Sequence, residues 1–289
     1  MKVMITGGGG QVATALVKTQ PPRTDVLSVS RAELDVSDRD AVMRWVTKVR
    51  PDILVNAAAY TAVDRAESEA GLAFRINADA AGYLAASAAE INARFIHIST
   101  DFVFDGTKSR PYQPADRTNP LNTYGASKLA GERQVAETLG ARAIILRSSW
   151  VYAATGANFV NTMLRLMRER QSLRVVSDQV GSPTWATSVA GAIWALVGHS
   201  GLAGIFHWTD AGVASWYDFA VAIQEEALAL ELLKKSIPIQ PITTEEYPLP
   251  AARPAYSVLD KQSTMTETGI TPAHWRVNLR AMLKELAHA

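Results

Sequence analysis

Along the first half of the chain, short runs rich in valine and isoleucine alternate with longer stretches of helical periodicity. The apolar runs lie at 3–5, 26–29, 53–55, 95–98 and 144–146. The helical patterns lie between them, at 12–18, 38–49, 69–92 and 124–139. Runs that are apolar on both faces and joined by helices predict a parallel sheet covered on both sides. We therefore expect an α/β fold with a doubly wound parallel sheet of the Rossmann type.

The second half is less regular. Helices are predicted at 158–170, 188–197 and 216–233, a short strand at 173–176 and an amphipathic C-terminal helix at 274–288. The proline-rich stretch 238–254 predicts irregular structure, or a strand with turns. We expect residues 1–150 to form a dinucleotide-binding domain, and residues 151–289 to form mainly a smaller, interleaved substrate-binding cap. The helices near 186–200 and 215–233 are expected to return to the first domain.

Composition narrows the function classes. The 289 residues are 48% hydrophobic, which is enough for a folded core. Lys and Arg total 29 against 28 Asp and Glu, so charge gives no reason to expect nucleic acid or an anionic membrane as a partner. The chain has no cysteine and its five histidines are scattered, so we predict no metal site. No apolar run approaches the about 18 residues that span a bilayer, and no secretory signal is evident, which predicts a cytoplasmic protein.

A glycine-rich loop follows the first predicted strand and opens a helix. It has the spacing Gly7-x-x-Gly10-x-x-Ala13. Glycine lets the backbone approach a ligand closely, and a helix start offers free N–H groups to a pyrophosphate. We therefore predict that this loop, with Gly7 and Gly10, binds a dinucleotide.

The end of the second strand bears on the choice of cofactor. A ribose 2′-hydroxyl needs a carboxylate there, but the chain offers Ser30-Arg31, and an arginine accommodates a 2′-phosphate. We therefore expect NADPH, with NADH as the alternative. Asp35 and Val36 follow and are placed to reach the adenine. Ala57, Ala58 and Ala59, after the third strand, present backbone with little bulk for a cofactor lying along the strand ends.

The pentapeptide Tyr124-Gly-Ala-Ser-Lys128 is the most informative about chemistry. Positions i and i+4 share a helix face, so the ammonium of Lys128 is expected beside the phenol of Tyr124, lowering its pKa from about 10. Such a tyrosine can donate a proton to a carbonyl oxygen during hydride delivery. The fourth strand ends in Ser-Thr100-Asp101. Thr100 can hydrogen-bond the same oxygen, and Asp101 can accept from a sugar hydroxyl.

These residues belong to longer motifs. The motifs in the first half are Gly-x-x-Gly-Gln-Val in the glycine loop and the segments 56–67, 99–106 and 120–132. The motifs that follow are Arg147–Tyr152, Asn158-Phe159, Asp178–Thr184 and Arg253-Pro254. Together they make the chain similar to the extended short-chain dehydrogenase/reductases, and within them to the dTDP-4-dehydrorhamnose reductases. The similarity runs through nearly the whole chain, and the motifs of the second half are the specific part.

The resemblance implies an activity: NAD(P)H-dependent reduction of the C4 keto group of dTDP-4-dehydro-6-deoxy-L-mannose to dTDP-L-rhamnose. It implies Tyr124 as proton donor, Lys128 as its partner and Thr100 as the third catalytic residue. The same resemblance places further residues at the cofactor, namely Gly10, Gln11, Val12, Asp35, Val36, Ala59, Tyr60 and Thr61. It places Thr100, Asp101, Trp150, Asn158, Gln179 and Arg253 at the substrate, with Arg253 facing the diphosphate.

One departure concerns assembly. Some members of the family pair subunits through Mg²⁺ held by acidic residues, but residues 13–16 and 185–188 contain no carboxylate. We therefore expect a monomer without bridging Mg²⁺, with a homodimer as the alternative. Two other functions stay open: a nucleotide-sugar epimerase or dehydratase of the same superfamily, and a non-catalytic, reductase-like regulatory subunit.

Overall fold

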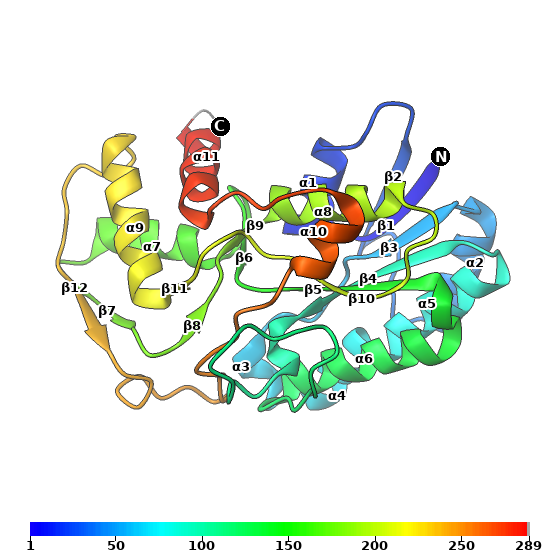
Figure 1. Ribbon diagram of the computed structural model, residues 1–289, viewed down its shortest axis with the longest axis horizontal. Helices are drawn as coiled ribbons and strands as arrows, with labels where there is room; N and C mark the ends of the chain where they lie inside the picture. The colour runs from blue at the N-terminus through cyan, green and yellow to red at the C-terminus, as the bar shows by residue number, and fades with distance from the viewer. Residues whose placement is uncertain (288–289) are drawn as a thin grey trace.

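The centre of the computed structural model, which describes residues 1–287, is a six-stranded parallel sheet (Figure 1). Its strands, in the order β10-β5-β4-β3-β1-β2, are Gly204–His207, Ala143–Ser148, Arg94–Thr100, Ile53–Asn56, Lys2–Gly8 and Asp25–Ser30. The five predicted runs all form strands of this sheet, which confirms the fold class. The sixth, β10, was not predicted, because its sequence Gly-Ile-Phe-His has only two consecutive apolar residues.

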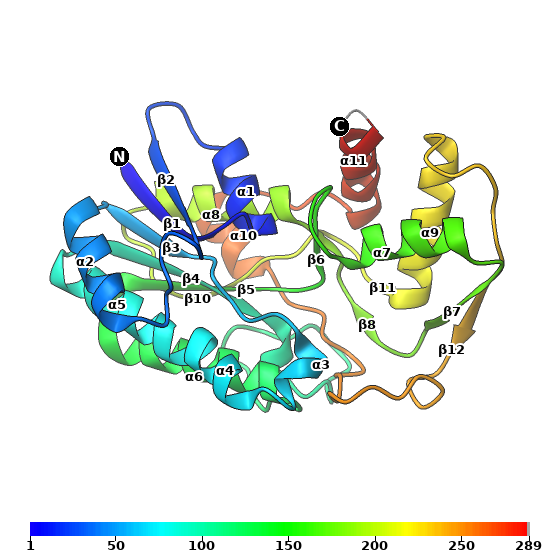
Figure 2. The ribbon, with the colours of Figure 1, turned by 180° about the vertical axis from the view of Figure 1, so that it is seen from behind.

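Helices cover both faces of the sheet (Figure 2). On one face, α1 (Gln11–Lys18) and α8 (Ala186–Gly198) pack over Val3 and Ile5 of β1. On the other face, Met4 packs in a second core with α2, α5 and α6 (Arg39–Val49, Ala80–Glu90 and Thr123–Leu139). Successive side chains of a strand point to opposite faces, so a strand buried on both faces needs an unbroken apolar run.

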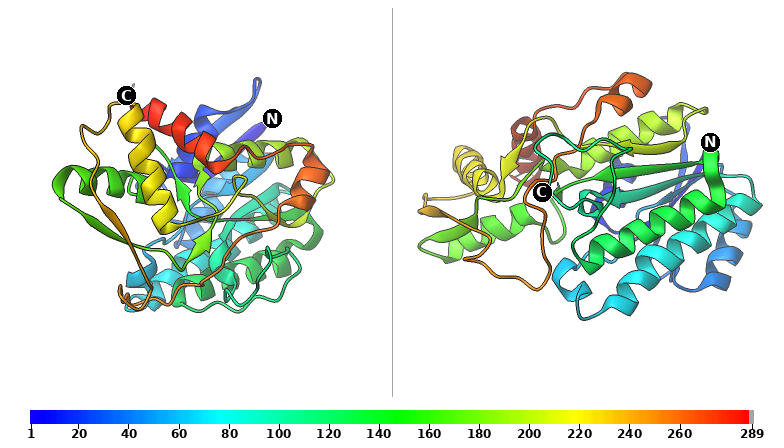
Figure 3. Two further views of the ribbon diagram at one scale, coloured as in Figure 1. Left: turned by 60° about the vertical axis from the view of Figure 1, so that its left-hand side comes forward. Right: turned by 60° about the horizontal axis from the view of Figure 1, so that its bottom comes forward.

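A second unit packs around its own core (Figure 3). It contains the helices α7, α9 and α11 (Phe159–Glu169, Trp216–Ala229 and Trp275–Ala287) and the parallel pair β7 and β12 (Leu173–Val176 and Ile239–Ile242). Phe219, Leu279 and Leu164 are buried at its centre. The expectation that the helix near 215–233 returns to the sheet was wrong, because the apolar face of α9 is buried against α7 and α11. The domain boundary at residue 150 stays a prediction.

Several short elements connect these layers. The helix predicted at 69–92 is divided into α4 (Ala70–Phe74), the π-helical turn η1 (Arg75–Asp79) and α5. Others were not predicted, because pieces of two to seven residues leave little periodicity; these are α3 (Val63–Ala66), η2 (Asp101–Val103), η3 (Gly140–Arg142), β6 (Val151–Tyr152), β8 (Val180–Gly181), β9 (Thr184–Trp185), β11 (Ala214–Ser215) and α10 (Gln262–Thr268).

Residue 288, where the predicted C-terminal helix ends, lies outside the described residues. Among residues 1–287, no helix has both the length and the apolar character needed to cross a membrane.

Candidate active site

The glycine loop between β1 and α1 is shaped for close approach. Gly7 has a φ of 78°, and a Cβ on it would stand 2.7 Å from the backbone of Ala57, so only glycine fits there. The N–H of Gly10 donates to the carbonyl of Gly7 at 3.0 Å. Gly10 gives α1 no side-chain cap. The N–H groups of the first turn, beginning at Gln11, are therefore left for a ligand, and an anion is the ligand they favour.

The end of β2 carries a carboxylate that we did not predict. Glu33 accepts hydrogen bonds from the backbone N–H of Ser30 at 2.8 Å and from its hydroxyl at 2.7 Å. These bonds lower the pKa of Glu33, so it is ionised at neutral pH. Arg31 and Asp35 are exposed, and Val36 packs partly into the core. The Ser-x-x-Glu spacing is a known local hydrogen-bonding pattern and could have revealed Glu33.

The segment after β3 presents mainly its backbone. The side chain of Asn56 stabilises a turn in this segment, because its Oδ1 accepts a hydrogen bond from the N–H of Ala58 at 3.2 Å. Ala57 and Ala58 are half-buried, whereas Ala59 and Thr61 are exposed. The side chain of Tyr60 is buried, and its hydroxyl donates to Glu69 Oε2 at 2.7 Å. The backbone N–H of Tyr60 donates to Asn77 Oδ1 at 2.9 Å, and its carbonyl accepts from Asn77 Nδ2 at 3.1 Å.

Helix α6 places the predicted catalytic pair, Tyr124 and Lys128, beside the end of β4. Asn122 caps the helix by accepting from the N–H of Gly125 at 2.8 Å, which puts Tyr124 in the first turn. One turn later, Lys128 Nζ donates to the carbonyl of Ile98 at 2.6 Å. The side chain of Thr100, the last residue of β4, lies near the phenol of Tyr124 and lowers its pKa. The structure thus brings the three predicted catalytic residues together.

The electrostatics differ from our expectation. Burial raises the pKa of Tyr124 to about 12, and the nearby charge of Asp101 raises it further, while the hydrogen bond with Thr100 lowers it. The predicted lowering by Lys128 is wrong for this site. Desolvation also lowers the pKa of Lys128 to about 8, and its ammonium points at a backbone carbonyl. The phenol is therefore fully protonated at neutral pH.

Asp101 lies next to this phenol and is buried. Its Oδ1 accepts from Thr100 Oγ1 at 3.0 Å, and its Oδ2 has no hydrogen-bond partner among the described residues. Burial raises the pKa of Asp101 to about 6, although hydrogen bonds from Ser257 and Thr100 lower it. A buried carboxylate oxygen without a partner is unfavourable and suits a ligand hydroxyl.

A cavity of about 420 Å³ opens between the second unit and the segment 244–253. Gln179, Trp216 and Arg253 are among its lining residues. Trp216 Nε1 donates to Gln179 Oε1 at 3.2 Å, and Gln179 Nε2 donates to Thr244 Oγ1 at 3.0 Å. The walls are otherwise mostly apolar, which is typical of a small-molecule site with a few orienting polar groups.

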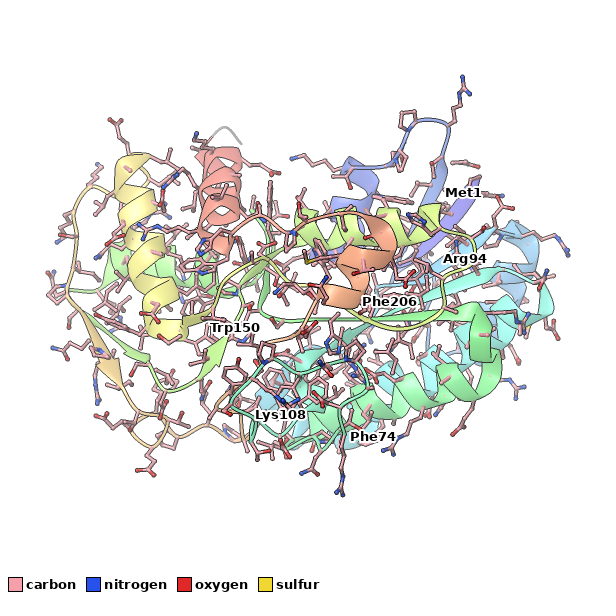
Figure 4. The ribbon with its side chains drawn as sticks, viewed as in Figure 1. Met1, Phe74, Arg94, Lys108, Trp150 and Phe206 are labelled. Atoms are coloured by element: carbon pink, nitrogen blue, oxygen red, sulfur yellow. The ribbon has the colours of Figure 1, made fainter. Side chains whose placement is uncertain are left out.

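Trp150 lies where the two units meet (Figure 4). Its ring is stacked on Trp216, with centroids 3.5 Å apart. Its φ is 47°, a conformation rarely adopted outside glycine. A Cβ on Gly181 would stand 2.6 Å from the Trp150 ring, so the indole fits against this strand only because residue 181 is glycine.

Asn158 and Arg253 are each held by protein groups. The side chain of Asn158 caps α7, and its amide donates to Gln11 Oε1 at 3.1 Å, so it lies by the glycine loop and does not line the cavity. Arg253 forms an ion pair with Asp64 at 2.8 Å. Sequence reasoning missed Asp64 and Trp216, whose roles depend on partners far away in the chain. A search of the described residues finds no cluster of three or more His, Cys, Asp or Glu able to hold a metal.

Comparison with known proteins gives consistent results. The family model described as "RmlD substrate binding domain" matches residues 1–288. A dTDP-4-dehydrorhamnose reductase of Burkholderia thailandensis is 42% identical, covering 99% of each chain.

Solved structures are similar along the whole chain. The dTDP-4-dehydrorhamnose reductase of Bacillus anthracis, in complex with NADP, is 36% identical, with a TM-score of 0.93 and coverage of 98% of this chain and 99% of that one. A UDP-glucose 4-epimerase of Thermus thermophilus, in complex with NAD, is 20% identical with a TM-score of 0.83 over 100% of both chains, a likeness of fold alone.

Proposed function

Since the chain belongs to the dTDP-4-dehydrorhamnose reductase family, we propose that it reduces the C4 keto group of dTDP-4-dehydro-6-deoxy-L-mannose to give dTDP-L-rhamnose. The observation that carries this is the grouping of Tyr124, Thr100 and Lys128 at the carboxyl end of a Rossmann-type sheet, the edge at which such sheets bind ligands. The glycine loop, with its uncapped helix start, suits the pyrophosphate of a dinucleotide.

In the proposed reaction, a nicotinamide cofactor held at the glycine loop would supply the hydride that C4 of the sugar accepts. Tyr124 donates the proton of its hydroxyl to the keto oxygen, so the carbonyl becomes a secondary alcohol. When the substrate binds, the hydroxyl of Thr100 turns away from Asp101 Oδ1 and donates to the same keto oxygen. Because the pKa of Tyr124 is about 12, the phenol is an acid with its proton in place at neutral pH. Lys128 is charged below about pH 8, and we assign its ammonium, which donates to the carbonyl of Ile98, to the ribose of the nicotinamide.

For the substrate, we assign the cavity to the nucleotide part. Gln179 is placed to hydrogen-bond the base, and Arg253 to hold the diphosphate with two of its N–H groups. Asp101 and Trp150 are assigned to the sugar, because the unpaired Oδ2 of Asp101 can accept from a hydroxyl. Asn158 is assigned to the boundary between substrate and cofactor, since it contacts Gln11.

For the cofactor, we propose NADPH, held by the residues predicted along β1, β2 and β3, with Arg31 at the 2′-phosphate. Glu33 supports the alternative, NADH, because a carboxylate at the end of β2 can accept from a ribose 2′-hydroxyl. Dissociation constants decide between them. Arg31→Ala is expected to weaken the binding of NADPH more than the binding of NADH. Glu33→Gln is expected to leave the binding of NADPH unchanged. Tighter binding of NADH by the unmodified protein would refute the preference.

The test of the activity is oxidation of NADPH that depends on the dTDP keto sugar. An epimerase would convert its substrate with no net use of cofactor, and a regulatory subunit would oxidise none. The presence of Tyr124, Lys128 and Thr100 argues against a non-catalytic subunit, and membership of the reductase family favours reduction over epimerisation.

We also propose a cytoplasmic monomer that does not depend on Mg²⁺, acting on a dTDP-sugar with no nucleic acid or membrane partner. Residues 13–16 at the start of α1 carry no carboxylate to bind a bridging ion. Sedimentation with and without EDTA tests this. A dimer that dissociates on chelation would show that a metal joins the subunits.

A further inference from the structure

A two-pronged ion pair connects the rim of the cavity to the sheet unit. Arg253 Nη1 and Nη2 donate to Asp64 Oδ1 and Oδ2 at 3.0 and 2.8 Å. Asp64 Oδ1 also accepts from the backbone N–H of Ala251 at 3.3 Å. Asp64 lies in α3, just after β3, whereas Arg253 lines the cavity. The pair therefore fixes a cavity residue against the edge of the sheet where the reaction is proposed to occur.

The pair leaves part of the guanidinium free. An arginine has five N–H donors in a rigid plane. The pair uses one on each terminal nitrogen of Arg253, and a second on Nη1 donates to the carbonyl of Ala251 at 2.8 Å. The Nε–H and the second Nη2–H have no partner among the described residues. These two donors form the side edge of the plane, and such an edge fits two oxygens of a phosphate.

We propose that Asp64 is a positioning residue: it holds the terminal edge of Arg253 so that the side edge faces the diphosphate of the sugar nucleotide. The proposal rests on the proposed function, in which Arg253 binds that diphosphate. A long, flexible arginine loses rotamer freedom when it binds, and a partner that orders it beforehand reduces this loss.

The segment that carries Arg253 is also fixed to the helix that carries the proton donor. Asn122 Nδ2 donates to the carbonyl of Ala252 at 2.7 Å, while its Oδ1 caps α6. Glu67, one turn beyond Asp64, accepts from the N–H of Thr123 at 2.8 Å. Together these contacts set the distance between the anion-binding group and Tyr124, so a diphosphate held at Arg253 places the sugar at a defined distance from the phenol.

An opposite role for Asp64 makes a different prediction. As a hydrogen-bonded partner of Arg253 it is ionised, since that bond lowers its pKa, and it therefore neutralises the arginine. If Asp64 competed with the diphosphate for Arg253, removing its charge would tighten binding. If it positions Arg253, removing its charge weakens binding. The sign of the change separates the two roles.

The experiment is calorimetric titration with dTDP of the unmodified protein, Asp64→Asn, Arg253→Ala and the double variant. We expect Asp64→Asn to bind dTDP about tenfold more weakly, the effect of one ordered side chain. We expect the double variant to bind no more weakly than Arg253→Ala, because Asp64 acts only through Arg253. Thymidine, which has no phosphate, and NADPH should bind all four proteins within twofold of each other. Glu169→Gln, which breaks an exposed arginine pair on α7, is the matched control and should bind dTDP normally.

Several results would overturn the proposal. These are unchanged or tighter dTDP binding by Asp64→Asn, an added loss in the double variant, and an equal loss for thymidine. If Asp64→Asn does not fold, Arg253→Lys decides: lysine keeps the charge but lacks the side edge, so dTDP should bind weakly while the melting temperature is maintained. Normal dTDP affinity in that variant would refute the arrangement in which Asp64 holds the terminal edge of Arg253 and the diphosphate binds its side edge. An unmodified protein that neither binds dTDP nor oxidises NADPH with the keto sugar would refute the proposed function instead.

Discussion

At the scale of single residues, burial decides which groups carry protons in this site. Tyr124 and Asp101 hold their protons to higher pH than in water, and Lys128 loses its proton at lower pH. The sequence showed that a phenol and an ammonium share one helix face. It could not show that desolvation outweighs their interaction, because desolvation depends on the packing of β4 and α6 together.

Replacing Tyr124 with phenylalanine removes the proton donor and keeps the ring. We expect kcat for the keto sugar to fall by about 100-fold or more, the usual contribution of a positioned general acid. NADPH affinity should change little, because the ring still fills the same space. Steady-state kinetics and cofactor titration check both. Turnover near normal would remove Tyr124 from the proposed role.

The pKa of Lys128, about 8, sets an expected pH dependence. The ammonium is charged below this pH and neutral above it, so kcat/KM should fall as the pH rises through about 8. This parameter reports the groups of the free enzyme. Lys128→Met should be slow at all pH values and lack this step. A step that persists in Lys128→Met would assign the titration to another group.

Asp101 should weaken the fold at neutral pH. Its folded pKa of about 6 exceeds the ordinary value of 3.8, so the folded state binds more protons than the unfolded state between these values. The free energy of unfolding therefore decreases as the pH rises from about 4 through about 6. Asp101→Asn should lose this dependence and be more stable at pH 8 by about 1–3 kcal/mol. Urea denaturation at pH 4 and pH 8 measures it, and an equally pH-dependent variant would contradict it.

At the scale of elements, α6 connects the site to the buried interior. Glu132, two turns beyond Tyr124, pairs with Arg147 of β5 at 2.6 Å, and both side chains are buried. The hydroxyl of Ser99 also donates to Glu132, which fixes the residue before Thr100. Glu132 and Arg147 both lie in the sequence motifs, but nothing in the sequence predicts that they form an ion pair. Their pairing depends on β5 lying beside β4 in the sheet.

Breaking this pair should be far more harmful than breaking an exposed one. Glu132→Gln leaves the Arg147 cation buried with less compensation, so we expect a loss of about 3–5 kcal/mol in the free energy of unfolding. Glu169→Gln, in an exposed pair on α7, should lose less than about 0.5 kcal/mol. Chemical denaturation of both variants checks the contrast. Similar losses would show that Glu132 adds no stability beyond that of a surface charge.

At the scale of the whole molecule, the chain order and the spatial order of the sheet differ. Five strands come from the first 148 residues, and their apolar runs predicted them. The sixth, β10, pairs with β5 from a position beyond residue 200, and α8 covers one face from residues 186–198. The local pattern did not reveal β10, because its two apolar residues become a strand only by pairing with β5.

Truncation tests this dependence. A fragment of residues 1–150 lacks both α8 and β10. The side chains of Leu16, Ile96 and Leu146 would therefore lose the core residues that these two elements contribute. We expect the fragment to show no cooperative thermal transition by circular dichroism, while the full chain shows one. A sharp transition in the fragment would establish residues 1–150 as an independent folding domain.

The late position of β10 also matters while the protein is being made. At a synthesis rate of about 5–20 residues per second, roughly 3–11 s separate the emergence of β5 from that of β10. During this interval, one apolar face of the growing sheet has no helix α8 to cover it, and β5 is an unpaired edge. Until the last third of the chain arrives, the nascent sheet therefore exposes both a strand edge and an apolar face through which chains can associate.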